Sequence, residues 1–165
     1  MAIWHFDLTL VPVTGLVKVF GEIPSLLPEY GAMTLDADLN SEFANYWEGI
    51  DIFQSVLPEA KTILSNEYAS SDNKVKLGTK EGNRLSIWKD DFFFDFDLRN
   101  PDLEILEAFL RLARKLDCKL VVNHGHVIEP MMLPVLEAVK ASGAYKFVRD
   151  PQQWLSHIAS RSSES

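Results

Sequence analysis

The sequence predicts an α+β domain: an antiparallel sheet, made of a meander plus an N-terminal strand, with helices packed mainly on one face. Three observations favour this class. Residues 91–99 alternate apolar and polar side chains at the two-residue period of a half-buried strand, and residues 3–11 repeat this period. Short turns join the meander strands, whereas parallel strands need a crossover of about a dozen residues. An acidic strand face also argues against a sheet that is covered on both sides.

The N-terminal third carries one clear element. The strand at 3–11 ends where Pro12 removes a backbone donor. Residues 13–71 give weak signals, because prolines divide them into short apolar clusters. Helices are expected over 41–47 and 58–64.

A short acidic segment resembles half of a calcium loop, since Asp36, Asp38 and Asn40 place oxygens at alternate positions. Ser41 occupies the position that needs glycine, and Trp47 the position that needs a bidentate glutamate. We therefore expect an Asx-turn that leads into a helix capped by Asn40 or Ser41.

The pattern in the middle of the chain predicts the meander. Residues 74–77 and 84–87 alternate apolar and polar side chains around a turn at 80–83. A second turn, near residues 89–90, leads into the strand at 91–99. These strands are adjacent in the sequence, so we expect them to pair in order.

A helix is expected to begin at Asn100-Pro101, with Asn as the cap and Pro at the first helical position. Its apolar stripe should face the core. A buried strand at 119–122 follows, which either joins an edge of the sheet or runs parallel after the crossover. The residues of the stripe are Leu103, Leu106, Phe109, Leu110, Ala113 and Leu116.

Two more helices close the chain. Residues 135–141 read as a helix, and Gly143 stands where a left-handed cap is expected. Asp150 and Gln153 form a capping-box arrangement at the start of the last helix. Residues 161–165 are small and polar and should fray, which leaves 1–160 as a single domain.

Composition excludes several function classes. With 24% charged and 47% hydrophobic residues the chain has ordinary globular usage. The net charge of -8 repels nucleic acid and anionic membranes. No apolar run is long enough to span a bilayer and no basic leader precedes one, so we expect a cytoplasmic protein. Cys118 is the single cysteine, which fits a reducing compartment, and no cofactor is indicated.

The polar face of the predicted sheet is the main candidate site. If the strands at 3–11 and 91–99 share a sheet, their carboxylates lie on one side, opposite an inward row of phenylalanines. Aromatic residues among carboxylates are typical of protein-binding surfaces, so we expect this face to dock a basic protein partner. The candidate binding residues are Asp7, Trp88, Phe93, Asp95 and Asp97.

Three alternatives leave this face without such a role. Arg84, Arg99, Lys74 and Lys76 share it and can neutralise the carboxylates as cross-strand pairs. The first third of the chain can cover the aromatic side chains. A homodimer can also hide the open face.

A histidine cluster offers a different chemistry. His124 and His126 directly follow a predicted strand, and Glu129 can add an oxygen ligand, so the set permits a metal site. The alternative function is therefore a metal-assisted hydrolase, with Asp95 as a candidate base. The same residues, with Gly125 between the histidines, equally resemble a polar hairpin turn.

The second half of the chain resembles small acidic bacterial proteins of unknown function, some of which are immunity proteins that neutralise secreted toxins. The resemblance lies in the strand at 91–99, the helix opened by Asn100-Pro101 and the closing segment 147–151. It implies stoichiometric inhibition of a toxin without catalysis. No functional residue is carried over from it.

Overall fold

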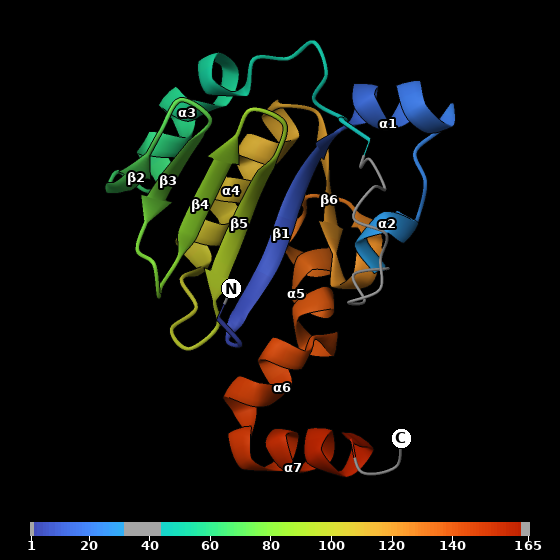
Figure 1. The fold of residues 1–165 in the computed structure, drawn as a ribbon, viewed down its shortest axis with the longest axis vertical. Coiled ribbons are helices and arrows are strands. Elements are labelled where there is room, and N and C mark those ends of the chain that lie inside the picture. Colours follow the sequence, from blue (N-terminus) through green and yellow to red (C-terminus); the bar gives the residue numbers. More distant parts are fainter. Residues whose placement is uncertain (1, 32–43, 163–165) are drawn as a thin grey trace.

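A computed structural model describes residues 2–31 and 44–162. Its seven strands form one sheet in the order β2-β3-β4-β5-β1-β6-β7, and every neighbouring pair is antiparallel (Figure 1). The fold is therefore α+β, as the sequence predicts. The strands are β1 (His5–Pro12), β2 (Glu67–Ser70), β3 (Lys74–Gly78), β4 (Arg84–Trp88), β5 (Phe92–Asp97), β6 (Cys118–Val122) and β7 (His126–Ile128).

The helices cover mainly one face of this sheet. In Figure 1, α4 lies behind the strands and the opposite face looks towards the viewer. No described helix is both long and apolar enough to cross a membrane. The helices are α1 (Val13–Phe20), α2 (Pro28–Gly31), α3 (Ile52–Ile63), α4 (Leu103–Lys115), α5 (Met132–Ala141), α6 (Gly143–Arg149) and α7 (Pro151–Ser162), with a 3-10 turn η1 (Asn123–Gly125).

The alternation of β1 and β5 builds the core. Phe92, Phe94 and Phe96 are fully buried and face α4, where the Phe94 and Phe109 ring centroids lie 4.9 Å apart. Each fully buried phenylalanine contributes about 1.5–3 kcal/mol by leaving water. The inward orientation of the phenylalanine row is confirmed.

The meander also has the predicted form, because β3, β4 and β5 pair in order through short turns. The strand predicted at 119–122 is β6, which pairs antiparallel with β1 and is followed by β7. β6 therefore neither lies at an edge nor runs parallel. Pro12 does not end the pairing of β1, since it still lies opposite Cys118 as the last residue of the strand.

Helix α4 begins later than the sequence predicts. Its cap is Asp102, whose Oδ1 accepts from the Glu104 and Ile105 amides at 3.0 and 3.1 Å, so the proposed cap at Asn100-Pro101 is wrong. The central part of its predicted stripe is buried, but Leu103 is 51% exposed because it lies in the first turn.

Two further helix boundaries differ from expectation. Gly143 is the first residue of α6 and not a left-handed cap, because the Ser142 hydroxyl accepts from the Tyr145 amide at 3.2 Å and starts a new helix. Helix α3 begins at Ile52, before the predicted 58–64, because the Asp51 carboxylate caps it through the Gln54 amide.

The other predicted helices agree with the structure only in part. The Asp150 cap is confirmed, since its Oδ1 accepts from the Gln153 amide at 3.0 Å. Helix α7 reaches Ser162, inside the segment expected to fray. The predicted helix at 41–47 is not helical over 44–47. Its start, and the Asx-turn or calcium loop at 36–41, lie outside the described residues.

Candidate functional site

A groove of about 730 Å³ lies on the polar face of the sheet. Its floor is formed by side chains of β1, β3, β4, β5 and β6, among them Asp7, Asp95 and Phe93. One wall comes from Tyr30 of α2 together with Asp91, which precedes β5. At one end lie η1 and the first residues of α6, so segments distant in the sequence enclose the strands.

The wall that carries Tyr30 depends on a close backbone contact. Gly125 has a φ of +99°, and a Cβ there would lie 2.2 Å from the Leu27 carbonyl oxygen. The Leu27 amide donates to the Gly125 carbonyl at 2.8 Å, and the Leu27 side chain is fully buried. Glycine is thus needed for α2 to dock on η1 and to bring Tyr30 to the groove.

A row of three charged side chains crosses the groove floor. Arg84, Asp95 and Asp7 lie opposite one another on β4, β5 and β1. Arg84 Nε donates to Asp95 Oδ2 at 2.6 Å, and the Asp95 side chain is 1% exposed. The predicted cross-strand neutralisation is therefore present at Asp95.

Asp7 is the carboxyl group of this row that forms no ion pair with a described residue. Burial raises the pKa of Asp7 to about 8, and a hydrogen bond with Asp95 acts in the same direction. The Asp7 Oδ1 atom is buried and accepts no hydrogen bond from the described residues. At neutral pH Asp7 therefore retains its proton.

Asp97 lies outside the groove lining and has a structural role. Arg99 binds both of its oxygens, at 3.0 and 2.9 Å, and the Asn83 side chain accepts from its amide at 2.9 Å. Burial raises the pKa of Asp97, but the hydrogen bonds from Arg99 outweigh this effect and lower the pKa. The guanidinium of Arg99 also lies over the Trp4 ring, 4.2 Å from its centroid.

These aspartates do not face water, although the sequence places them on the polar face of the sheet. Asp95 and Asp97 are 1% and 7% exposed, because arginines and neighbouring backbone cover them. Of the two predicted aromatic residues, Phe93 lines the groove and is half-buried. Trp88 does not line it, and its ring lies beneath the Lys74 ammonium at 5.2 Å.

Two groove residues were missed as candidates. Asp91 shares the strand face of Phe93, and burial raises the pKa of its carboxyl to about 6, with Asp90 adding to the effect. The alternation of residues 91–99 places Asp91 on this face, so the signal was present. Tyr30 follows a stretch with no readable pattern, and nothing in the sequence indicated it.

The histidine cluster forms the turn of the β6–β7 hairpin. His124 and His126 are both exposed, but only His124, which has a φ of 64°, lines one end of the groove. The Glu129 carboxylate accepts from Lys119 Nζ at 2.5 Å. Among residues 2–31 and 44–162, no three His, Cys, Asp or Glu side chains are placed to share a metal ion. The hairpin interpretation thus describes the segment, and His124, His126 and Glu129 do not meet as a ligand set.

Comparisons of the chain with protein-family models, with curated proteins and with solved structures find no match.

Proposed function

We propose that this chain is a non-catalytic binding module that takes a basic segment of a partner protein into the groove on its polar sheet face. The observation that carries the proposal is that, of the three predicted carboxylates, two have an arginine partner and one has no ion-pair partner among the described residues. Asp95 and Asp97 already hold Arg84 and Arg99, whereas Asp7 forms no ion pair among the described residues and lies on the groove floor.

A cation of the partner protein can form the ion pair that Asp7 does not form with the described residues. A lysine or arginine beside Asp7 favours the ionised carboxylate, so its pKa falls and the proton leaves on binding. The pair forms in a partly desolvated groove, where charges attract each other more strongly than in water. Asp91 adds a second carboxyl group at the wall, and Phe93 offers an aromatic surface to a cationic side chain.

An immunity-type inhibitor is one form of such a module, in which the basic segment belongs to a toxin. It fits the acidic charge of the chain, since opposite charges speed association. A gene for a basic secreted toxin beside the gene for this chain supports this form of the proposal, and capture of that toxin by the purified chain tests it.

Two catalytic alternatives are less well supported. A metal-assisted hydrolase needs the histidine cluster to gather ligands, and Glu129 is instead engaged by Lys119. Acid–base chemistry at the Asp7–Asp95 pair is favoured by the raised pKa of Asp7, since perturbed carboxyl pairs occur in active sites. However, Asp95 is almost fully buried and held by Arg84, which leaves little access for a substrate.

Binding of a labelled arginine-rich peptide tests the proposal, with a glutamate-rich peptide of equal length as the control ligand. We expect the arginine peptide alone to bind, and Asp7→Asn and Phe93→Ala each to weaken binding by about tenfold or more. Glu48→Gln is the matched carboxylate control, because Glu48 is 68% exposed and outside the groove. Equal binding by Asp7→Asn and the wild type, or no preference for the basic peptide, overturns the proposal.

A further inference from the structure

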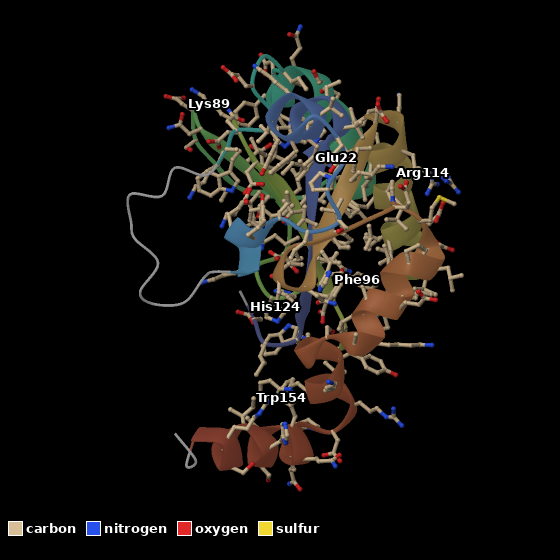
Figure 2. The ribbon with its side chains drawn as sticks, turned by 90° about the vertical axis from the view of Figure 1, so that its right-hand side faces the viewer. Glu22, Lys89, Phe96, Arg114, His124 and Trp154 are labelled. Atoms are coloured by element: carbon tan, nitrogen blue, oxygen red, sulfur yellow. The ribbon has the colours of Figure 1, made fainter. Side chains whose placement is uncertain are left out.

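The last two helices form an arm that is anchored to the core through Ala144, Tyr145 and Val148 of α6. Helices α6 and α7 extend beyond the end of the sheet, and Trp154 lies well away from the strands (Figures 1 and 2). Within this C-terminal arm, residues 143–162, the Phe147 and Trp154 rings pack edge to face at 5.7 Å. From Pro151 to Arg161 every residue except Trp154 is exposed.

Such exposure leaves α7 with little to stabilise it inside one chain. The helix has 12 residues, and isolated helices shorter than about 12–15 residues are marginal in water. Its sequence includes serine, histidine and glutamine and carries an outward apolar side chain, Leu155, which is 52% exposed. A packed partner would supply the burial that α7 otherwise lacks.

The charge of the arm is opposite to that of the rest of the chain. Lys146, Arg149 and Arg161 stand against Asp150, which gives the arm a net charge of +2 within a chain of net charge -8. The arm is therefore a basic segment with aromatic and aliphatic side chains, which is the chemistry that the groove is proposed to accept.

The position of the arm suits a reciprocal contact. Ser142, Gly143 and Ala144, from which the arm starts, line the groove at one end. An exchange of arms between two copies related by a two-fold axis would be reciprocal, and such an interface closes on two chains. We propose that the arm docks in the groove of a second copy and so forms a reciprocal homodimer. This inference rests on the proposed function, because it names a second copy as the basic partner of the same groove.

Sedimentation of the full chain over a range of concentrations tests the inference. We expect a dimer, with twice the chain mass of 18.7 kDa. Leu155→Glu in the arm and Phe93→Ser in the groove should each raise the dimer dissociation constant by about tenfold or more. The matched control is Leu133→Glu, since Leu133 is 69% exposed on α5 and lies outside the arm. This variant should stay dimeric.

The outcomes separate the inference from the proposed function. A wild type that is monomeric at every concentration, or a dimer unaffected by Phe93→Ser in a protein that unfolds normally, overturns the docking of the arm. Arg149→Glu/Arg161→Glu provides a second arm variant in exposed positions, and its dimerisation at wild-type strength contradicts the inference as well. A monomeric wild type that still binds the arginine peptide leaves the proposed function intact.

Discussion

Asp7 on β1 lies directly opposite Asp95 on β5, so the sheet places two carboxyl groups side by side on its polar face. Arg84 donates a hydrogen bond to Asp95, while burial and the neighbouring Asp95 raise the pKa of Asp7 to about 8. At neutral pH Asp7 therefore retains its proton. This proton links the stability of the fold and the binding properties of the groove to pH.

The first prediction concerns stability and pH. Asp7 loses its proton near pH 3.8 in the unfolded chain and near pH 8 in the folded one, so the folded state binds more protons between these values. The contribution of Asp7 to the free energy of unfolding is complete below about pH 4 and is lost as the pH rises to 8. We expect Asp7→Asn, which mimics the protonated group, to be more stable than the wild type above this pH by on the order of 2–5 kcal/mol.

Urea unfolding at several pH values between 4 and 9 measures this effect, with Glu48→Gln as a control whose stability should follow the wild type. A wild type and an Asp7→Asn variant with parallel pH profiles would show that Asp7 titrates normally.

The second prediction concerns the buried ion pair between Arg84 and Asp95, whose side chains are 12% and 1% exposed. Arg84→Met leaves a buried carboxylate without its cation, and we expect a loss of about 3–5 kcal/mol in the free energy of unfolding. Lys18→Met is the control, because Lys18 and Glu48 are both 68% exposed and such pairs contribute about 0–1 kcal/mol. Thermal and urea unfolding compare the two variants, and equal losses would contradict the assigned burial.

Much of the sheet could be predicted from the sequence, because its strands and turns are specified by patterns of neighbouring residues. Alternation along residues 91–99 places Phe94 and Phe96 on one face whatever the partner strands are, and short turns force the antiparallel order. The position of β6 between β1 and β7 could not be read in this way. It depends on which strand edges remain available after the meander has formed.

The site was only partly predictable, because it depends on contacts between segments that are distant in the sequence. Alternation places Asp7 and Asp95 on the polar face, but it does not give their burial. Arg84 lies against Asp95, and other parts of the groove lining come from α2 and η1. Residues 13–71 show no helical period of apolar residues that would predict α2. Asp97 was misjudged because a side chain two residues away, Arg99, folds back over it.

The third prediction compares two neighbouring phenylalanines on opposite faces of β5. Phe94 is fully buried against Phe109, so Phe94→Ala should cost about 3–5 kcal/mol in the free energy of unfolding. Phe93 is half-buried in the groove, and Phe93→Ala should cost clearly less while it weakens binding of the basic peptide. Urea unfolding together with peptide titration separates these effects. A larger stability loss at Phe93 would reverse the assignment of the two faces.

The last prediction concerns the contact that brings α2 to the groove. In Gly125→Ala the new Cβ meets the Leu27 carbonyl oxygen at 2.2 Å at a φ of +99°, so backbone must move and we expect a loss of at least about 3 kcal/mol. Gly21→Ala is the matched control: it has a φ of +75° but nothing within 4 Å of the new Cβ, and should cost about 1–2 kcal/mol from backbone conformation alone. Hydrogen exchange adds a local measurement, because the Leu27 amide donates to the Gly125 carbonyl and should lose protection in Gly125→Ala but keep it in Gly21→Ala. Equal stability losses with an unchanged Leu27 amide would mean that α2 does not depend on this contact, and that Tyr30 reaches the groove by other packing.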